Sequence, residues 1–351
     1  MTLPSITREY RVSKRGLGSI DALTLISDVP VPTPVANDVL VKIRAVSLNY
    51  RDLMLVLGLY PGAKENTIPC SDAAGEVVAV GDRVTKWKVG DRVTVNFSTA
   101  HLHGDITPAI MAHSLGANAD GTLTEYRSFP AEAVVSIPDH LTFEQAATLP
   151  CAGVTAWNAL QGPVPLKGGD YVLVQGTGGV SVFGIQFAHA LGATIIATSS
   201  SNEKLKVAKK LGADFVINYK ENPDWEQDVL KITDGRGVDH IIEVGGTNTI
   251  IKSIKAVRHA GWIHNIGFLA GFDSDVKPAE ITGSLLFKGA IFRGILVGSV
   301  SQFEDMNRLI SSHKIVPVVD KVFEFAEAKE AYKYLESQKH VGKVVIRVAS
   351  N

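Results

Sequence analysis

The chain has 351 residues, of which 45% are hydrophobic and 20% are charged, and its formal net charge is −1. This length suggests about two domains, and a charge near zero argues against nucleic acid or an anionic membrane as a partner. The two cysteines, Cys70 and Cys151, cannot build a disulfide framework. No apolar run approaches the roughly 20 residues of a membrane span, and the opening MTLPSITREYRVSKRG does not resemble a signal peptide. We therefore expect a cytoplasmic globular protein.

The first part of the chain, to about residue 136, has the pattern of a barrel-like antiparallel β unit. Residues 38–49 (DVLVKIRAVSLN) alternate as a half-buried strand does. Further strands are predicted within residues 73–84 and 89–95, where Gly-Asp pairs mark the turns between them. Residues 97–121 are irregular and predict a long surface loop, which in a compact domain is usually functional or disordered.

From about residue 150, apolar strand patterns alternate with helical patterns, which predicts a parallel sheet covered on both faces. Helices are expected at 179–191, 202–211, 224–233 and 249–258. The strands are expected at 171–176, 194–199, 214–219, 238–245, 262–267 and 290–298. Six strands joined by right-handed crossovers give a doubly wound α/β dinucleotide-binding fold.

The C-terminal segment predicts two helices, at 301–313 and 326–337, and a closing strand, GKVVIRV. That strand has no neighbouring α/β partner, so we assign it to the first domain. The expected domains are therefore 1–136 with 299–351, and 137–298.

A glycine turn follows the strand at 171–176 in the stretch VQGTGGV. Gly176, Gly178 and Gly179 lie at the junction of this strand and the next helix, where glycines let the backbone approach a pyrophosphate at the positive helix end. Val180, in the first turn of that helix, is a further candidate cofactor contact. A tight turn without a ligand is the alternative, but the position at the first junction of a six-strand alternation favours a dinucleotide.

The second strand of this unit ends in serines, where an NAD site commonly has an acid. Ser199, Ser200 and Ser201 can donate hydrogen bonds to a 2′-phosphate, Lys204 can add positive charge, and Tyr219 can close over the same pocket. Alternatively, Ser200–Asn202 would cap the following helix, with Lys204 on the surface; both roles can hold together. We expect NADP(H) rather than NAD(H).

Six stretches are spread along nearly the whole chain: GDRV, DGTLTEY, AATLPCAGVTAWNAL, VLVQGTGGV, KLGADFVINY and HVGKVVI. Together they resemble the medium-chain dehydrogenase/reductase superfamily, and within it the zinc-independent quinone oxidoreductase and enoyl reductase branch. The resemblance implies a GroES-like β-barrel catalytic domain followed by a Rossmann domain, with the C-terminus returning to the barrel.

The resemblance also allows a test for catalytic zinc. The positions of the first two ligands in the zinc enzymes hold Asn49 and, in the stretch CSDAAGEV, Ser71 and Asp72, and only the third ligand remains, as Cys151. One thiol without an imidazole cannot form the three-ligand site of a catalytic zinc. We expect no metal, and we expect Cys151 to be a small packing residue.

Without zinc, hydride transfer to an enone, enal or quinone needs hydrogen-bond donors for the developing oxyanion. By resemblance to the family's substrate loop, Tyr60, Asn49 and Tyr50 are the candidate catalytic residues, although Tyr60 could simply pack in a turn. Asp52 is expected to pin the loop through backbone hydrogen bonds. Arg51 departs from the usual small or apolar residue and is expected on the surface, unless it attracts an acidic substrate.

Further cofactor contacts follow from the resemblance and from the fold. Thr155 matches a residue that contacts the nicotinamide carboxamide, and Lys343 matches a C-terminal contact on the cofactor side. The crevice where the strand order reverses would be lined by residues after the fourth and fifth strands. These are Gly245, Gly246, Ile266, Gly267 and Phe268.

The sequence thus predicts an NADPH-dependent reductase of quinones or activated C=C bonds, with a small hydrophobic carbonyl or quinone substrate. A carbonyl or alcohol dehydrogenase of the same superfamily and an NADPH-binding protein without catalysis are the alternatives. The long apolar edge strand at 290–298 predicts a homodimer, because an uncovered edge invites pairing with another chain.

Overall fold

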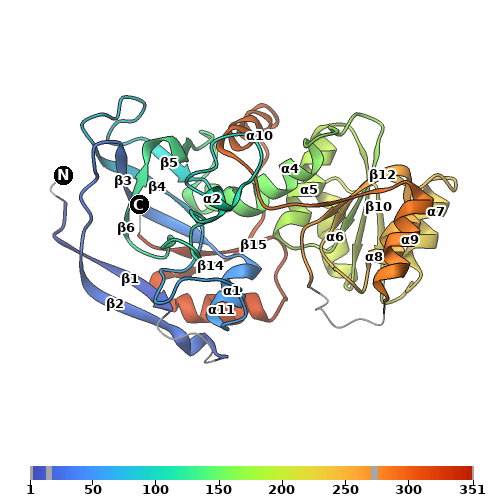
Figure 1. Ribbon diagram of the computed structural model, residues 1–351, viewed down its shortest axis with the longest axis horizontal. Helices are drawn as coiled ribbons and strands as arrows, with labels where there is room; N and C mark the ends of the chain where they lie inside the picture. The colour runs from blue at the N-terminus through green and yellow to red at the C-terminus, as the bar shows by residue number, and fades with distance from the viewer. Residues whose placement is uncertain (1–2, 13–17, 270–275, 350–351) are drawn as a thin grey trace. The chain divides into compact units, whose positions relative to one another are not determined.

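The computed structural model describes residues 3–12, 18–269 and 276–349 (Figure 1). It divides into two compact units: one runs to Val154 and resumes at Val297, and the other spans Thr155–Leu296. The first boundary therefore lies later than the expected residue 137. The reason is that α3 (Phe143–Ala146) and the π-helix Leu149–Gly153 pack on the strands of the first unit.

The first unit is built on a seven-stranded sheet in the order β14-β15-β3-β4-β5-β7, with β6 also paired to β3. A two-stranded antiparallel ribbon, β1 (Ile6–Val12) with β2 (Leu23–Pro30), accompanies this sheet. The closing strand β15 pairs antiparallel with β3 and parallel with β14, as predicted for a strand that returns to this domain. The sheet strands are β3 (Asp38–Ser47), β4 (Asp72–Val80), β5 (Arg92–Val95), β6 (Tyr126–Pro130), β7 (Val134–Ser136), β14 (Val319–Glu324) and β15 (Lys343–Arg347).

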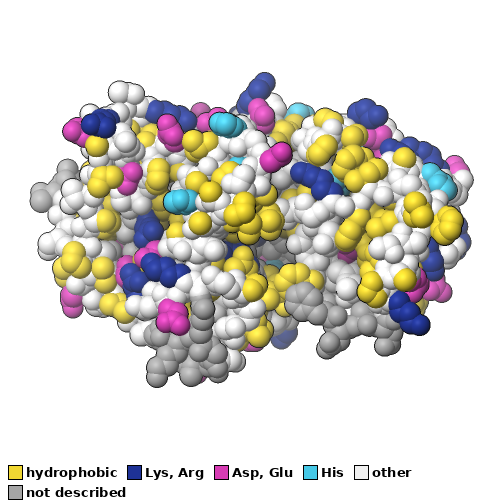
Figure 2. All heavy atoms as spheres, in the orientation of Figure 1, with side chains coloured by type: hydrophobic (Ala, Val, Ile, Leu, Met, Phe, Trp, Pro, Cys, Tyr) yellow, Lys and Arg dark blue, Asp and Glu magenta, His cyan; other side chains and the backbone are white. Residues whose placement is uncertain are grey.

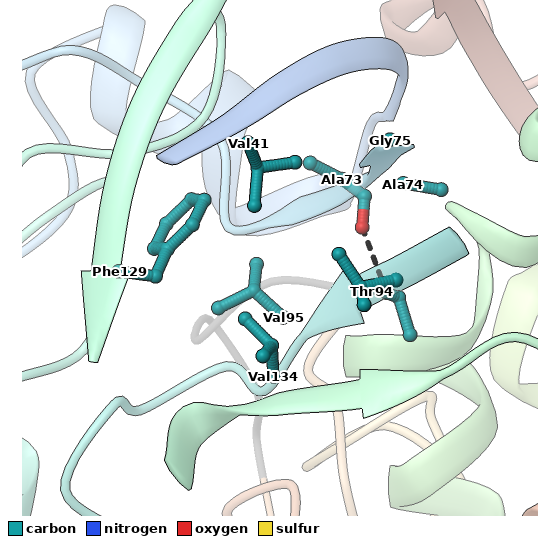
Figure 3. Close-up of a pocket in the computed structure, with 9 residues that line it drawn as sticks. Val41, Ala73, Ala74, Gly75, Thr94, Val95, Phe129 and Val134 are labelled. Carbon is teal, nitrogen blue, oxygen red and sulfur yellow. Dashed lines mark hydrogen bonds between the residues drawn. The ribbon is translucent and has the colours of Figure 1, made fainter. Parts of the chain in front are cut away.

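Among the further helices of this unit are α1 (Tyr50–Val56), α10 (Val300–His313), α11 (Ala328–Glu336) and the start of α4 (Val154–Leu160). The barrel interior is well filled. A void of about 10 Å³ is lined by Val41, Phe129, Val134 and neighbouring small residues. Figure 3 shows the arrangement of these side chains. That volume is about the minimum for one water molecule, so the void is a packing defect rather than a ligand site.

The loop at 97–121 is held to its surroundings by backbone hydrogen bonds. Leu115 N donates to the Phe97 carbonyl at 3.0 Å, and Val300 N of α10 donates to the carbonyl of His101 at 2.9 Å. The loop contains one short helix, α2 (Pro108–Met111). His101 of this loop is buried, and its Nε2 lies 2.9 Å from the Gly104 carbonyl.

The second unit contains the predicted six-stranded parallel sheet, in the order β10-β9-β8-β11-β12-β13. Its strands are β8 (Tyr171–Gln175), β9 (Thr194–Ser199), β10 (Phe215–Asn218), β11 (Val238–Glu243), β12 (Val257–Asn265) and β13 (Ile291–Gly294). Its helices are α5 (Gly179–Ala190), α6 (Asn202–Lys210), α7 (Trp225–Ile232), α8 (Ile250–Ala256) and α9 (Pro278–Lys288), with most of α4.

The edge strand β13 is shorter than the predicted 290–298. Its register pairs Ile291 with Trp262 and Gly294 with Asn265, the last residue of β12. Because β12 ends at Asn265, residues beyond Gly294 have no neighbouring strand to pair with, and β13 ends there.

The exposed surface carries charges of both signs. Basic and acidic side chains are interspersed over the face shown in Figure 2. Within the described ranges, no helix is both long and apolar enough to span a membrane.

Two histidines stack inside the parallel sheet of the second unit. His240 Nδ1 lies 3.0 Å from His264 Nε2, and both residues are buried. Burial lowers the pKa of His264 to about 3 and also lowers that of His240. At these two side chains the folded protein therefore binds fewer protons than the unfolded chain in acid.

We expect the free energy of unfolding to fall as the pH drops from about 6.5 toward 3. Each such histidine lowers the free energy of unfolding by up to about 1.4 kcal/mol per pH unit, because it is protonated in the unfolded state but stays neutral in the folded state. In denaturant titrations between pH 7 and 4, His264→Gln should flatten this slope, whereas the exposed control His313→Gln should leave it unchanged. Equal slopes for the two variants would contradict the assignment.

Candidate functional site

The turn between β8 and α5 has the geometry expected of a phosphate-binding loop. Gly176 adopts φ 72°, a conformation that glycine adopts far more readily than other residues. Gly178 caps α5 without a side-chain hydrogen bond, and a Cβ on Gly178 would meet open space. The first amides of α5, from Gly179 and Val180, thus lie at the positive end of a 12-residue helix. These residues fit a dinucleotide pyrophosphate.

The serines after β9 have three different environments. Ser199 is buried and its carbonyl accepts from Tyr219 N at 3.1 Å. Ser201 caps α6, its Oγ accepting from Lys204 N at 3.5 Å. Ser200 is half-buried. The capping alternative therefore holds for Ser201, and Ser200 is the serine that best combines accessibility with this position.

An acidic residue that sequence reasoning missed lies close to these serines. Glu221, after β10, accepts from Asn202 Nδ2 at 2.6 Å and from Asn218 Nδ2 at 2.9 Å. Its carboxylate is exposed and hydrogen-bonded by both amides. Tyr219, from the same segment, is 42% exposed.

A buried carboxylate organises the backbone at the carboxyl ends of β8 and β11. Glu243 Oε1 accepts from Gly245 N at 2.8 Å, Gly246 N at 3.0 Å and Thr249 Oγ1 at 2.6 Å. Its Oε2 accepts from Gln175 Nε2 at 2.7 Å and from Ser253 Oγ. The predicted crevice residues Gly245 and Gly246 are therefore fixed in place by an acid that the sequence analysis did not single out.

The segment after β12 joins the same edge of the sheet. Ile266 N and Gly267 N both donate to the carbonyl of Glu243, at 2.9 and 3.4 Å. A Cβ on Gly246 would lie 2.9 Å from the Phe268 Cα, so this close approach requires glycine. The predicted crevice residues of this unit are thus brought together. Thr155 belongs to the same unit and is buried in α4.

In the first unit, Asn49 and Asp52 form the start of α1. Asp52 Oδ2 accepts from Asn49 N at 2.8 Å, which confirms the expected backbone anchor. Burial raises the pKa of Asp52 to about 6. Tyr50, the second predicted phenol, is exposed, whereas Tyr60 is partly buried against the core.

Lys343 lies deep in this unit, with only 3% of its side chain exposed. Its Nζ donates to the Leu48 carbonyl at 2.6 Å and to Asn49 Oδ1 at 2.5 Å, and it lies 3.9 Å from Asp72 Oδ2. Sequence reasoning placed Lys343 on the cofactor side but missed its ammonium contact with Asn49.

Asp72 and Cys151 complete this cluster. Asp72 accepts from Ser71 Oγ at 2.6 Å and from Cys151 N at 3.2 Å, and burial raises its pKa. Burial also raises the pKa of Cys151 to about 12, so its thiol stays protonated. The charges of Asp72, Lys343, Arg51 and Asp52 all act on this thiol, which makes them one electrostatic cluster.

This donor set does not fit a catalytic zinc. Zinc ligands are thiolates, imidazoles or carboxylates, but one ligand position here holds an amide, Asn49, whose Oδ1 already accepts from the Lys343 ammonium group. A cation at Asp72 would also repel a metal ion. Across the residues that the structure describes, no group of three or more His, Cys, Asp or Glu side chains is arranged to hold a metal.

Arg51 is buried rather than on the surface, so that expectation was wrong. Only 12% of its side chain is exposed. Its guanidinium lies between two aromatic rings, 5.0 Å from the centroid of Tyr60 and 4.9 Å from that of Phe97. Cation–π contacts of this kind favour burial of an arginine that a charge count alone would assign to the surface.

Two family models match the chain. Residues 35–139 match the alcohol dehydrogenase GroES-like domain, and residues 179–312 match the zinc-binding dehydrogenase family. A solved structure from Sinorhizobium meliloti, provisionally named an alcohol dehydrogenase, is 40% identical, with a TM-score of 0.90. The match covers 99% of this chain and 100% of that one.

Among curated relatives, a zinc-type alcohol dehydrogenase-like protein of Schizosaccharomyces pombe is 49% identical over 89% of this chain and 91% of its own length. A 2-methylene-furan-3-one reductase of Solanum lycopersicum is 33% identical over 99% of this chain and 80% of its own length. A chloroplastic NADPH-dependent alkenal/one oxidoreductase of Arabidopsis thaliana is 31% identical over 94% and 77%. The chain belongs to the medium-chain dehydrogenase/reductase superfamily, with its GroES-like and Rossmann-like units.

Proposed function

We propose that this protein is an NADPH-dependent oxidoreductase that reduces quinones or activated C=C bonds by hydride transfer without zinc. The observation that carries the proposal is the buried Asn49–Lys343–Asp72 arrangement in the first unit. Asn49 occupies the position of the first metal ligand in zinc enzymes, and here its Oδ1 accepts a hydrogen bond from the Lys343 ammonium group. Relatives named as reductases of a methylene-furanone and of alkenals and enones support the same reaction class.

The second unit would hold the cofactor. The amides at the start of α5 would bind its pyrophosphate, the loop fixed by Glu243 would border the crevice, and Ser200 with Lys204 would bind the 2′-phosphate. Bound nicotinamide supplies the hydride, whereas the protein supplies position and electrostatic stabilisation.

Conjugate reduction places negative charge on the carbonyl oxygen of the acceptor, so the chain must offer hydrogen-bond donors there. Asn49 Nδ2 is buried, and its amide group, which has two N–H donors, also stabilises the Asp72 carboxylate through a side-chain hydrogen bond. The bond from Lys343 to Asn49 Oδ1 orients this amide and polarises it toward donation. We assign Asn49 as the main oxyanion donor and Tyr60 as a second donor. Tyr50, which is exposed, is the weakest of the three candidates.

A zinc-dependent alcohol dehydrogenase is the second candidate, because one family model and the Schizosaccharomyces pombe relative carry zinc in their names. It requires Lys343 to leave Asn49 and Cys151 to lose its proton. The buried Lys343 ammonium group, bonded to Asn49 Oδ1 and to the Leu48 carbonyl, opposes the first change.

A panel of acceptors with NADPH tests the proposal. We expect NADPH oxidation with at least one of four acceptor classes: quinones, enals, enones and enoyl thioesters. The rate of NADP⁺ reduction by simple alcohols should be much lower. Heat protection by NADPH without turnover on any acceptor would instead indicate a cofactor-binding protein without catalysis.

The half-buried position of Ser200 gives a sharp test of cofactor choice. We expect Ser200→Asp to lower kcat/KM for NADPH by at least about tenfold, because a carboxylate beside a phosphate costs more than 1.4 kcal/mol. The value for NADH should change far less, and Ser200→Ala should have a small effect on both. Initial rates with the two coenzymes measure the ratio. An unchanged ratio in Ser200→Asp would exclude this site for the 2′-phosphate.

We further propose a homodimer through the edge strand β13. Large apolar side chains are exposed on this strand and on the preceding helix, including Leu286 at 77% and Phe287 at 85%. Exposed apolar surface beside an unpaired strand edge favours association. Sedimentation of the purified chain should give a dimer that Phe287→Glu weakens, and a monomer at micromolar concentration would contradict the proposal.

A further inference from the structure

An acidic side chain lies just beyond β10 and is held against the first residue of α6. Glu221 Oε1 accepts hydrogen bonds from Asn202 Nδ2 at 2.6 Å and from Asn218 Nδ2 at 2.9 Å. Asn218 Nδ2 also donates to Asn202 Oδ1 at 2.9 Å, and the backbone N–H of Glu221 donates to the Asn218 carbonyl at 3.1 Å. These bonds hold an exposed carboxylate at the start of α6.

This carboxylate is close to the serine that would bind the 2′-phosphate. Asn218 pairs with Ser199 in the parallel register of β10 and β9, so the two strands end at the same level. Asn202 follows Ser200 by two residues, a stretch of chain that spans at most about 7 Å. The Glu221 charge and a phosphate bound at Ser200 are therefore separated by a distance on the order of one Debye length, which is about 10 Å at 0.1 M salt.

A purely structural role for Glu221 requires an oxygen acceptor but no charge. Both of its side-chain donors are neutral amides, so they leave the negative charge uncompensated. A glutamine side chain carries a carbonyl oxygen in the same place and could accept both bonds. The charge of Glu221 is thus the property that these hydrogen bonds do not explain.

A carboxylate beside the adenosine ribose distinguishes the two nicotinamide coenzymes. It can accept a hydrogen bond from the 2′-hydroxyl of NADH, whereas it repels the 2′-phosphate of NADPH. Dinucleotide folds that prefer NADH commonly have this acid at the end of the second strand, where the present chain has serines. An acid that reaches the same place from the next strand would have the same electrostatic effect.

We propose that Glu221 is a coenzyme-specificity residue, whose charge weakens binding of the 2′-phosphate and thereby lets the protein use NADH as well as NADPH. This inference rests on the proposed function, in which Ser200 and Lys204 bind that phosphate. Glu221 supplies, from the segment after β10, the acid that the end of β9 lacks. The preference for NADPH that the serine and the lysine create is correspondingly modest.

Glu221→Gln tests the inference, because it removes the charge and keeps the oxygen acceptor. Calorimetry with NADPH and with NADH gives both dissociation constants without any acceptor substrate. In about 10 mM salt, where screening is weak, the variant should bind NADPH at least about threefold more tightly than the wild type. Its affinity for NADH should be equal or lower. In about 0.5 M salt the gain for NADPH should largely disappear, because the charges are then screened.

Glu280→Gln is the matched control. Glu280 is also an exposed acid in the first turn of a helix, α9. That helix packs on α8 and β12, and three other strands separate β12 from β10 in the sheet. The ratio of NADPH to NADH affinity in Glu280→Gln should therefore equal that of the wild type at both salt concentrations. Equal thermal midpoints for the two variants and the wild type would show that all three are folded alike.

Three results would overturn the inference while leaving the proposed function intact. They are an unchanged affinity ratio in Glu221→Gln, a gain in NADPH affinity that does not depend on salt, and a wild-type protein that binds NADPH but not NADH. A wild-type protein that binds neither coenzyme would instead refute the proposed function, and this inference with it.

Discussion

Lys343→Met is expected to lower the free energy of unfolding by about 3–5 kcal/mol, because it leaves the fully buried Asp72 without its cation. The lysine also satisfies the Leu48 carbonyl and Asn49 Oδ1, and both acceptors would lose their donor. Methionine has a similar length and no charge, so the packing volume changes little. Denaturant titration at pH 7 measures the loss.

A double variant separates charge from packing in this experiment. Asp72→Asn added to Lys343→Met should recover much of the lost stability, since no isolated charge then remains buried. Lys64→Met, which removes an exposed lysine beside Asp120, should cost less than about 1 kcal/mol. A small effect of Lys343→Met, comparable to that of the surface control, would refute a buried ion cluster at this position.

Glu243→Ala is expected to have a comparable effect in the second unit and to impair cofactor binding as well. The substitution removes the acceptor of five hydrogen bonds from Gly245, Gly246, Thr249, Gln175 and Ser253. Buried donors left without an acceptor cost about 1–3 kcal/mol each before relaxation. We expect a total loss of about 3–5 kcal/mol, because part of the network can rearrange.

The cofactor readout distinguishes this role from a purely structural one. NADPH should raise the thermal midpoint of the wild-type protein, and this increase should be much smaller in Glu243→Ala at the same concentration. Glu221→Ala, which removes an exposed acid held by two amides, serves as the control and should cost little stability. Full protection of Glu243→Ala by NADPH would contradict a positioning role for this carboxylate.

The sequence predicted the fold well where local patterns repeat. Buried apolar runs separated by helical periods identified all six strands of the second unit, and the isolated strand GKVVIRV was correctly returned to the first. The boundary after residue 136 was less accurate, because packing of 143–153 on β3 and β4 is a tertiary property. The length of β13 likewise depends on where its neighbour β12 ends.

The candidate site was harder to predict, because its main contacts join distant parts of the chain. Lys343 and Asn49 are 294 positions apart, and no local pattern couples them. Arg51 was wrongly expected on the surface. It is buried by two aromatic rings that lie elsewhere in the sequence, and no local pattern indicates those contacts. Glu243 did leave a signal. An acid ends the buried run HIIE and a glutamine ends YVLVQ, and parallel strands bring such ends to one edge of the sheet.

Turnover measured against zinc content tests the central claim most directly. Protein purified with a strong chelator should contain far less than one zinc atom per chain, and it should still reduce its best enone or quinone acceptor with NADPH at the full rate. Added zinc should not increase that rate. A rate that rises in proportion to bound zinc, or that disappears with the metal, would contradict a reaction built on Asn49 and Lys343.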